Sequence, residues 1–552
     1  MSEPQVEAAG GAPGESDQNP DWVIHTAVSR RAAERPEAAA LVGRGAPVTY
    51  RELDAASDAY AERLAAVGVG PGTTVPLLLP RSARMAAVEL AVLKCGAAYA
   101  NIDPAWPAER QLSIVERIAP KAVVIDAVGA AAAAVRTVSE QFAGFTTVPV
   151  DLDVAEAAAQ GAATAPFVPP PVSPDDPATV IFTSGTTGGP KGVVVPHGAV
   201  TRFFVGADRF DGFGPGHAIA LVAAVAWDMY AFELWGQLTA GGTSAFADAD
   251  PLMPGALRQL TATAGVDTLW ITTTLFNLFV DEDVDCFAAL GRVYVGGEKL
   301  SSEHVRSFLR RHPSIPLWNC YGPAENCMFT TTWQLTEADC DIPEGVPIGT
   351  VVPGTTVLVV DGDGRRCAPG EVGEVLAAGR GLALGYLDQP ELTAEKFPTI
   401  DLDGTPTTVY RTGDQGLLDA DGVLWFRGRR DRQVKISGHR IELAEIEVAA
   451  RGVAGLRECV VVPLPEADGT VTGMALFFVA QPVADSPARS GGGPAAPALD
   501  ERTLRSELAR TLPGYLVPGT IRRLDQFPMT ANGKTDQAEL RTLAAGPRRG
   551  KR

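Results

Sequence analysis

The feature that most constrains the fold is a long alternation of apolar runs with amphipathic segments, from about Asp21 to Phe426. Buried strands that alternate with helices favour α/β layers with mainly parallel strands, so we predict an α/β fold for this region. An Ala- and Pro-rich segment at Asp151–Asp176 is predicted to be a connection. The clearest strand candidates are Thr74–Leu79 and Ala122–Asp126, and the clearest helix candidates are Arg51–Val67 and Arg84–Cys95.

The chain is also too long to fold around one hydrophobic core. It has 552 residues, whereas single cores stop growing near about 250–300 residues. The polar run Gly428–Gln433 precedes a last segment with its own strands, Glu458–Pro463 and Gly473–Val479, and a helix at Asp500–Leu512 that Asp500 is placed to cap. We predict a large domain of β-sheets flanked by helices and a small, mobile α+β lid. The predicted boundaries are a disordered leader at 1–19, the large domain at 20–428, a hinge at 429–433, the lid at 434–545 with a flexible loop at 485–497, and a basic tail at 546–552.

Charge and composition exclude several classes of protein. The net charge of −19 opposes binding to a nucleic-acid duplex, because that affinity depends on clustered Lys and Arg. The longest apolar run, Ala218–Trp227, is too short to span a membrane and is predicted to be a buried strand. The 7 cysteines include no CxxC pair and the 6 histidines show no metal-ligand spacing, so neither redox chemistry nor a structural metal is indicated. Residues 1–19 lack the apolar core of a signal peptide, which favours a cytoplasmic location.

One predicted turn contains hydroxyl side chains, glycines and a lysine, which is the composition of a phosphate-binding loop. After the apolar stretch Thr179–Phe182, the chain reads Thr-Ser-Gly-Thr-Thr-Gly-Gly-Pro-Lys-Gly. Glycines let backbone N–H groups approach phosphate oxygens, hydroxyls add donors, and Lys191 adds positive charge. The Walker loop is excluded, because it needs Gly-Lys followed by Ser or Thr, whereas Pro190 precedes and Gly192 follows this lysine. Composition alone fits a flexible hairpin as well as a nucleotide cradle.

This loop does not stand alone. Together with the motifs that follow, it resembles the adenylate-forming superfamily of acyl-CoA synthetases, luciferases and nonribosomal peptide synthetase adenylation domains. The match spans residues 25–540 and implies ATP and Mg²⁺ as cofactors, with a large domain and a mobile lid. The further motifs are Val48–Leu53, Leu93–Pro104, Asn319–Glu325, Gly379–Leu387, Tyr410–Asp414, Gly428–Glu447, Leu512–Pro518 and Asn532–Asp536.

The resemblance implies roles for residues whose chemistry suits attack of a carboxylate on the α-phosphate of ATP. Such an attack brings two anions together, so cations and magnesium are needed where charge accumulates. Lys534 would bridge substrate and ATP oxygens, Glu325 would hold Mg²⁺, and Thr187 would complete the catalytic set. Tyr321 would stack on adenine and Asp414 would accept the ribose hydroxyls. The implied ATP-binding residues are Thr183, Ser184, Gly185, Thr186, Thr187, Lys191, Gly297, Glu298, Asn319, Tyr321, Gly322, Asp414, Arg429 and Lys534.

Asp431 lies between the two predicted domains and resembles the hinge about which the lid swings. One face of the lid would deliver Lys534 for adenylation, and another, around Lys435–Arg440, would admit a phosphopantetheine thiol. Ser437 and Ala444 replace the more usual Arg and Gly of this motif.

A carboxylate in Ala226–Trp235 bears on the substrate. Asp228 aligns with the aspartate that pairs with the substrate ammonium in amino-acid-activating members, and an unpaired buried carboxylate would be costly beside an apolar acid. Trp227 would flank the substrate carboxylate. No charged side chain appears in the rest of the aligned pocket, so we predict an α- or β-amino acid with an apolar or aromatic side chain. The aligned pocket positions are Met229, Phe232, Trp270, Tyr294, Gly296, Cys320, Met328 and Phe329.

The predicted partner is a separate carrier protein with a phosphopantetheine arm, because no carrier segment follows Lys534 in this sequence. We therefore predict a stand-alone adenylation enzyme of natural-product biosynthesis, with free CoA as another possible acceptor and an MbtH-like helper left open. An acyl-CoA synthetase of aryl or fatty acids is the alternative enzyme, and Asp228 argues against it. A scaffolding protein with a decayed site is the non-enzymatic alternative, and the intact set Lys534, Glu325 and Asp414 argues against that.

Overall fold

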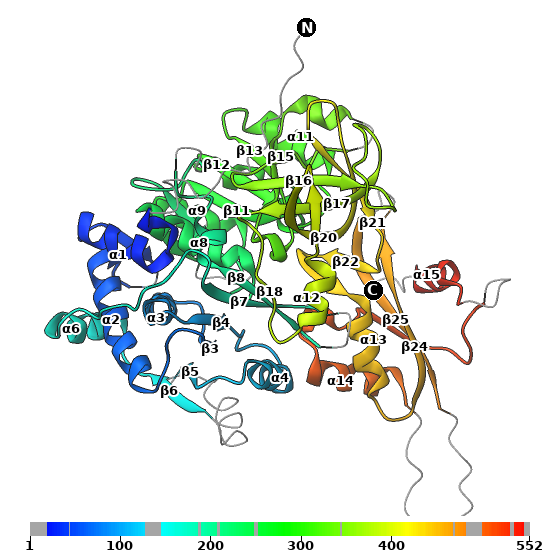
Figure 1. Ribbon diagram of the computed structural model, residues 1–552. Helices are drawn as coiled ribbons and strands as arrows, with labels where there is room; N and C mark the ends of the chain where they lie inside the picture. The colour runs from blue at the N-terminus through cyan, green and yellow to red at the C-terminus, as the bar shows by residue number, and fades with distance from the viewer. Residues whose placement is uncertain are drawn as a thin grey trace, which may run out of the picture.

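The computed structural model describes residues 19–43, 45–126, 145–185, 189–206, 210–247, 252–342, 345–466, 470–481, 499–529 and 535–545. A large α/β body is followed by a smaller domain at the C-terminal end (Figure 1). The predicted loop at 485–497 and the basic tail at 546–552 lie outside the described residues, as does the predicted leader apart from Asn19. Within the described residues, no helix has the length and apolar character needed to cross a bilayer.

The largest sheet joins nine of the described strands. Its central strands, from β13 to β1, pair in parallel, and β14, β15 and β2 pair antiparallel at the edges. Their order across the sheet is β15 (Thr350–Val351), β14 (Thr331–Gln334), β13 (Leu317–Tyr321), β12 (Arg292–Gly296), β11 (Thr268–Thr272), β9 (Ala218–Leu221), β10 (Thr243–Phe246), β1 (Ala39–Val42) and β2 (Val48–Thr49).

A second sheet joins seven of the described strands and contains both strands predicted near 74–79 and 122–126. The pairs from β7 through β6 are parallel, whereas β8 and β18 are antiparallel. Their order is β18 (Gly385–Tyr386), β8 (Lys191–Pro196), β7 (Pro177–Thr183), β4 (Ala98–Asn101), β3 (Thr74–Leu78), β5 (Ala122–Asp126) and β6 (Thr146–Val150).

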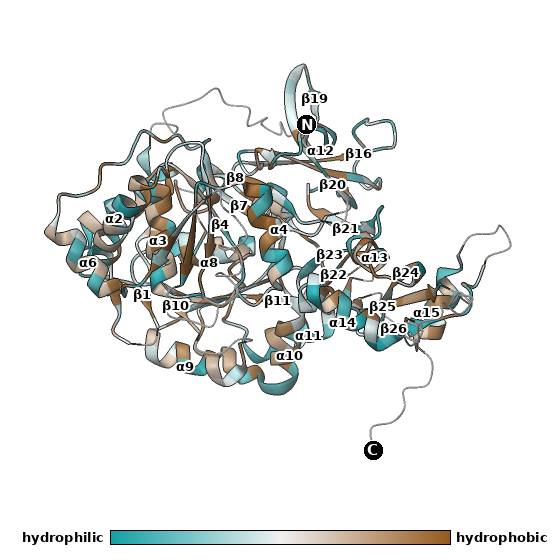
Figure 2. Ribbon diagram, turned by 90° about the horizontal axis from the view of Figure 1, so that it is seen from below, coloured by the Kyte–Doolittle hydropathy of each residue, from teal (hydrophilic) through white to brown (hydrophobic). Residues whose placement is uncertain are grey.

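Helices cover both faces of the large sheet. Successive residues of a strand point to opposite faces, so each strand contributes side chains to two separate cores. On β9, Ile219 and Leu221 belong to a core shared with the second sheet, whereas Ala218 and Ala220 belong to a core on the other face. Figure 2 shows the apolar faces turned toward these layers. The helices of this domain are α1 (Ile24–Glu34), α2 (Tyr50–Ala66), α3 (Ala83–Lys94), α4 (Ala108–Ile118), α6 (Val154–Ala163), α7 (His197–Thr201), α8 (Asp228–Ala240), α9 (Pro254–Ala264), α10 (Thr273–Asp283), α11 (Ser302–Arg311) and α12 (Pro390–Lys396). Short 3₁₀ helices lie at Pro20–Trp22, Val284–Phe287, Ala324–Asn326 and Glu337–Asp341.

The expectation of mainly parallel strands fails after about residue 355. A five-stranded antiparallel sheet occupies this part of the chain. Antiparallel neighbours need only tight turns, and Asp403 and Gly404 supply one between two strands, with φ angles of 52° and 86°. The strands are β16 (Thr355–Val360), β17 (Gly373–Gly379), β19 (Thr399–Leu402), β20 (Thr405–Leu418) and β21 (Leu424–Arg429).

Two further expectations are corrected. The predicted connection at 151–176 contains α6, because Asp153 and Glu156 form a capping box before an alanine run that favours a helix. The apolar run at 218–227 is a strand only as far as Leu221. Beyond it, the Glu233 carboxylate accepts the backbone N–H groups of Val222 and Ala223, both at 2.8 Å, so a loop is stabilised there instead.

The smaller domain has its own hydrophobic core, which includes Ile446, Phe478 and Leu508. The strands predicted at 458–463 and 473–479 and the helix predicted at 500–512 are present, and Asp500 caps that helix by accepting the N–H of Thr503 at 2.7 Å. The predicted fold class is therefore confirmed. The elements are β22 (Gln433–Ile436), β23 (His439–Glu442), α13 (Leu443–Arg451), β24 (Leu456–Pro465), β25 (Val471–Ala480), α14 (Glu501–Thr511), a 3₁₀ turn at Gly514–Leu516, β26 (Thr520–Arg523) and α15 (Gln537–Ala545).

Candidate active site

A cavity of about 380 Å³ lies between the large domain and the β22–β23 hairpin of the smaller one. Its walls come from the carboxyl ends of β7, β12 and β13 and from the start of α8, which is where open α/β sheets usually bind ligands. The predicted ATP-binding residues that line it are Thr183, Ser184, Gly297, Gly322, Asp414 and Arg429. The predicted substrate-binding residues that line it are Trp227, Asp228, Met229, Trp270, Gly296, Cys320, Met328 and Phe329.

The phosphate-loop candidate begins where β7 ends. Thr183 has a buried hydroxyl with no partner among the described residues. The Ser184 hydroxyl donates to the carbonyl oxygen of Arg440 at 2.7 Å, and the Gly185 N–H donates to the Glu445 carboxylate at 3.1 Å. A Cβ on Gly185 would lie 2.2 Å from the Gly189 carbonyl, so only glycine fits there. Thr186 and Thr187 lie outside the described residues.

Glu325, in the 3₁₀ turn after β13, is fully buried and has three polar partners. The Lys191 ammonium lies 3.0 Å and the Tyr386 hydroxyl 2.8 Å from Oε1, while the Arg440 guanidinium lies 2.6 Å from Oε2. Burial alone would raise the pKa of Glu325, but the charges of Arg440 and Lys191 reverse that effect and hold the pKa well below its usual range. The turn therefore carries an ionised carboxylate that binds cations.

A single carboxylate of this kind fits magnesium. Mg²⁺ commonly binds through one or two carboxylates together with substrate phosphates, and Glu325 pairs with Lys191, the lysine of the phosphate-loop candidate. Arg440 engages one of its oxygens in this arrangement. Metal binding at that oxygen would require the guanidinium to withdraw.

Asp228 is the first residue of α8 and is only 5% exposed. Its Oδ2 accepts the Met328 N–H at 3.3 Å. Within the described residues, no Lys, Arg or His side chain forms an ion pair with it. Burial raises the pKa of Asp228 to about 6, with the Met328 and Met229 N–H groups opposing the rise. The cavity wall thus presents a buried acid with no ion-pair partner among the described side chains, although the charge of Lys435, on the same cavity, opposes the rise of its pKa.

A polar network closes the opposite end of the cavity. Asp414 on β20 stands across from Arg429 on β21 and pairs with its guanidinium, and it accepts a hydrogen bond from the Tyr321 hydroxyl. Arg429 Nε also lies 2.8 Å from Asp431. The ring of Tyr321 faces the Lys435 ammonium, whose nitrogen is 5.8 Å from the ring centroid. Asp414 and Arg429 line the cavity, whereas Tyr321 does not.

Two other predicted ATP-binding residues contact neighbouring backbone. Glu298 accepts the Gly438 N–H of the β22–β23 hairpin at 3.1 Å. Asn319 is buried on β13 and donates to the Pro347 carbonyl at 2.7 Å, away from the cavity surface.

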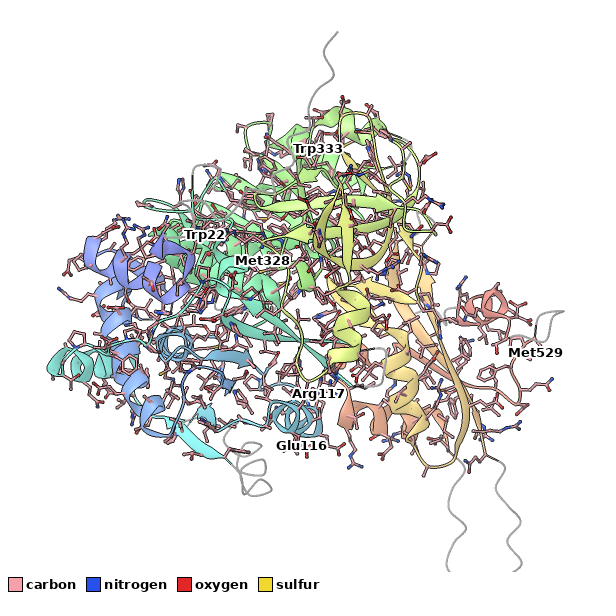
Figure 3. The ribbon with its side chains drawn as sticks, viewed as in Figure 1. Trp22, Glu116, Arg117, Met328, Trp333 and Met529 are labelled. Carbon is pink, nitrogen blue, oxygen red and sulfur yellow. The ribbon has the colours of Figure 1, made fainter. Side chains whose placement is uncertain are left out.

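An aromatic cluster closes the cavity behind its apolar wall. Phe232 and Tyr294, both predicted to bind substrate, belong to this cluster and are not among the residues that line the cavity. The ring of Phe210 stacks between Tyr294 and Phe329, with centroid distances of 5.9 and 6.0 Å. Phe329 belongs to both the cluster and the cavity wall. Met328, another wall residue that Figure 3 labels, is buried.

The hairpin of the smaller domain forms the remaining wall. The His439 ring stacks on Tyr515 at 4.0 Å and lies 6.2 Å from the Trp227 ring, so the three rings connect the two domains. Burial lowers the pKa of His439, which favours the neutral ring. Burial also lowers the pKa of Lys435, which lines the cavity with the hairpin residue Gly438.

Lys534 lies outside the described residues. Met529 and Thr535, on either side of it, form an isolated antiparallel bridge. In Figure 3, Met529 lies at the outer side of the smaller domain, far from Met328. Among the described residues of the smaller domain, those of the β22–β23 hairpin line the cavity together with Pro513, Gly514 and Tyr515.

Four residues at the site received no individual role from sequence reasoning, although one of them ends the stretch 435–440 that was expected to admit the thiol: Tyr386, Arg440, Glu445 and Arg110. Tyr386 and Arg440 both contact Glu325, and Arg110 contacts Glu445 at 2.7 Å. Three of the four lie inside motifs recognised in the sequence, and this position in a motif could have identified them as candidates. Their partners lie 61 to 335 positions away, so only the folded chain identifies them.

The AMP-binding enzyme family matches residues 28–387. Malpibaldin synthetase from Mortierella alpina is 36% identical over 528 residues, which are 95% of this chain and 9% of that protein. Tyrocidine synthase 3 from Brevibacillus parabrevis is 33% identical over 522 residues, which are 94% of this chain and 8% of that protein. The chain therefore spans less than a tenth of the length of either relative.

Solved structures resemble the whole fold. Holo-PA1221, an NRPS protein containing adenylation and PCP domains bound to a vinylsulfonamide inhibitor, aligns with a TM-score of 0.80 and 32% identity, covering 94% of this chain and 84% of that one. An artificially fused adenylation-PCP di-domain, NpsA-ThdA from Klebsiella oxytoca, aligns with a TM-score of 0.76 and 25% identity, covering 91% of this chain and 94% of that one.

Proposed function

Because this chain belongs to the AMP-binding enzyme family and has adenylation proteins of nonribosomal peptide synthesis among its relatives, we propose that it activates an amino acid with ATP. The substrate carboxylate attacks the α-phosphorus, the bond to pyrophosphate breaks, and an aminoacyl-adenylate forms. A phosphopantetheine thiol of a carrier protein then attacks the acyl carbonyl and releases AMP. The predicted carrier is a separate protein.

Asp228 is the observation that carries the choice of an amino acid. It is a buried acid on the cavity wall that forms no ion pair with a described side chain, and Lys435 acts on it only through its charge. Since burying an unpaired charge is costly, a substrate ammonium would supply the missing partner. Met229, Trp270, Met328 and Phe329 surround the space beside it, which supports an apolar side chain on the substrate.

Glu325 and Lys191 are proposed to serve the phosphate end. Mg²⁺ held by Glu325 and the ATP phosphates would neutralise charge on the pyrophosphate leaving group. Gly185 offers a backbone N–H and Thr183 an unpartnered hydroxyl to phosphate oxygens. Lys191 holds the Glu325 carboxylate in place by pairing with one of its oxygens.

The ribose and adenine are proposed to bind at the other end. Asp414 would accept the ribose hydroxyls, and Arg429 holds its carboxylate toward the cavity. Tyr321 would stack on adenine after its ring separates from Lys435. Asp431, paired with Arg429, is the proposed hinge, and Lys534 is proposed to reach the reacting atoms when the lid turns.

The arrangement seen here suits the second half of the reaction. The hairpin face, with Gly438 and His439, lies against Trp227 at the cavity wall. A thiol entering along this face would approach the acyl group held between Trp227 and Asp228. His439 and Tyr515 would form one side of its path.

The test is ATP–pyrophosphate exchange with a panel of α-amino, β-amino, aryl and fatty acids. The expected result is exchange that depends on one apolar amino acid. Transfer of that amino acid to a carrier protein would then demonstrate the second half-reaction. Exchange only with acids that lack an amine would support the acyl-CoA synthetase alternative. A Lys534→Ala control should lose about 10²–10³-fold in rate, because one charged contact at a reacting centre is commonly worth that much.

A further inference from the structure

A buried arginine beside the cavity wall is satisfied by backbone carbonyls rather than by an acid. Arg202 directly follows α7, is 2% exposed, and forms no ion pair among the described residues. Its Nη1 donates to the Ala199 carbonyl, and its guanidinium carbon lies 3.9 Å from the centroid of the Phe203 ring. Burial lowers its pKa to about 10, so the side chain still carries its charge near neutral pH. A buried charge is costly unless other groups satisfy it.

The other carbonyls belong to the loop that follows Glu325. Nη2 of Arg202 donates to three oxygens of this loop: Asn326 at 2.9 Å, Cys327 at 3.0 Å and Phe329 at 2.7 Å. Buried carbonyls need donors, and this nitrogen supplies one to backbone that belongs to no strand. One side chain therefore fixes the path of the loop.

The loop has a conformation that its residues rarely adopt. Cys327 and Met328 have φ angles of 44° and 68°. Positive φ is costly for residues with a Cβ, and such positions persist where the surrounding structure determines them. In this conformation the Met328 N–H donates to Asp228 at 3.3 Å, and Met328 and Phe329 both line the cavity. The strained loop thus builds the wall next to the buried acid.

A glycine leaves room for the guanidinium at this loop. A Cβ on Gly381 would lie 2.7 Å from both Cζ and Nη2 of Arg202, and 2.7 Å from the side-chain oxygen of Asn326. Atoms do not approach a Cβ so closely, so any larger residue would displace the guanidinium. The contact between Arg202 and the loop therefore depends on a residue from a third segment of the chain.

On the basis of the proposed function, in which Asp228 and this wall receive the amino acid, we propose that Arg202 is a positioning residue for substrate binding. It holds the loop in its strained form, which directs the Met328 N–H at Asp228 and keeps Phe329 in the wall. Arg202 is not among the residues that line the cavity, and it does not touch the reacting atoms. Its loss should weaken binding of the amino acid rather than slow the chemistry.

The phosphate end should respond much less, because other contacts fix it. The Glu325 carbonyl accepts the Ala383 N–H at 2.9 Å, and its carboxylate pairs with Lys191 at 3.0 Å. The carbonyls that Arg202 holds begin one residue later, at Asn326. Loss of Arg202 should therefore raise KM for the amino acid and leave KM for ATP nearly unchanged. A general loss of stability would not separate the two substrates in this way.

The kinetic experiment measures ATP–pyrophosphate exchange in the full chain, at a temperature where circular dichroism shows each variant to be folded. Arg202→Met keeps the length of the side chain and removes its donors, whereas Arg202→Lys keeps the charge without the guanidinium fork. Lys94→Met is the matched control. It removes another buried cation of the large domain, on α3, whose side chain is 3% exposed and whose nitrogen lies 2.5 Å from Asp58.

In Arg202→Met, KM for the amino acid should rise by about tenfold, equivalent to about 1.4 kcal/mol. We expect kcat and KM for ATP to change little in the same variant. Arg202→Lys should show a smaller rise, and Lys94→Met should show none. An equal rise of both KM values would overturn the inference, as would a rise no larger than that in Lys94→Met.

Amide hydrogen exchange tests the loop without any substrate. The segment 324–331 contains the Met328 N–H and the Thr330 N–H, which donates to the Tyr321 carbonyl at 2.7 Å. A peptide covering this segment should exchange its amide hydrogens about tenfold faster in Arg202→Met, because the loop opens more often. Lys94→Met should match the unsubstituted protein there. Unchanged protection in Arg202→Met would contradict the proposed hold on the loop.

If neither Arg202 variant folds, Gly381→Ala provides the same test, because its methyl group displaces the guanidinium and leaves the charge in the chain. It should raise KM for the amino acid and speed amide exchange in the segment 324–331. An unchanged result in both measurements would overturn the inference.

The proposed function fails separately, through absence of pyrophosphate exchange with every acid in the panel. Amide exchange requires no amino acid. Faster amide exchange in Arg202→Met, in a protein that activates no acid, would support the hold on the loop and overturn its role in substrate binding.

Discussion

Asp228, which lines the cavity, and Glu325, in the turn after β13, are two buried carboxylates whose surroundings differ in kind. Glu325 contacts Lys191, Arg440 and Tyr386, and its pKa is held well below its usual range. Asp228 has backbone N–H partners but no ion pair with a described side chain, and burial raises its pKa to about 6 against the opposing charge of Lys435. The protein neutralises the charge of Glu325 with its own side chains. At Asp228, the proposed function assigns the missing ion-pair partner to the substrate ammonium.

The largest loss of unfolding free energy is expected when the charge of Glu325 is removed. Glu325→Gln leaves Lys191 and Arg440 buried without a counter-charge, and removing one partner of a buried ion pair typically costs about 3–5 kcal/mol. Urea unfolding should report that loss, and exchange activity should fall with it. An unfolding free energy within about 1 kcal/mol of the unsubstituted protein would mean that the cluster contributes little to stability.

Asp228→Asn should separate stability from binding. Truncating one partner of a buried charge pair commonly costs about 2–5 kcal/mol, so kcat/KM for the amino acid should fall by about 10²-fold or more while ATP binding persists. The fold should lose no stability, because Asn removes an unpaired buried charge and can still accept the Met328 N–H. Urea unfolding and exchange kinetics on the same preparation measure both quantities. An unchanged substrate profile would place the ammonium elsewhere.

The pH dependence of kcat/KM should distinguish Asp228 from Glu325. The folded pKa of Asp228 is raised, so the free acid gains a proton as the pH falls through about 6 and no longer attracts an ammonium. We expect kcat/KM for the amino acid to decline below about pH 6 by up to tenfold per pH unit, with the decline absent in Asp228→Asn. Glu325 should stay ionised across this window. A decline of the same shape in Asp228→Asn would assign the titration to another group.

The smallest effect is expected from Tyr386→Phe. It removes a hydroxyl 2.8 Å from Glu325 and leaves both cations in place. A hydrogen bond to a charged group is worth about 1.5–3 kcal/mol, so the loss of unfolding free energy should be well below that of Glu325→Gln. Urea unfolding of the two variants in parallel measures both losses of unfolding free energy. A larger loss in Tyr386→Phe than in Glu325→Gln would mean that the hydroxyl stabilises the cluster more than the two cations do.

Much of this could be predicted from the sequence, because motif residues report local chemistry. The strands near 74 and 122, the Asp500 cap and the membership of Asp228, Met328 and Asp414 in one cavity were all accessible in this way. The pairing of Arg440 with Glu325 was not, since the two are 115 positions apart and only the folded chain brings them together. Phe232 and Tyr294 could be aligned with a pocket, but sequence does not reveal that other rings separate them from it.

The aromatic cluster behind the cavity has an evolutionary consequence. Phe329 packs against Phe203, Phe210 and Phe232 on one side and lines the cavity on the other, so one ring belongs to both the domain core and the cavity wall. A mutation that reshapes the pocket there also opens a void in the core. New substrate preferences at this wall are therefore coupled to losses of stability, and a lineage that changes its substrate would have to repack the cluster at the same time.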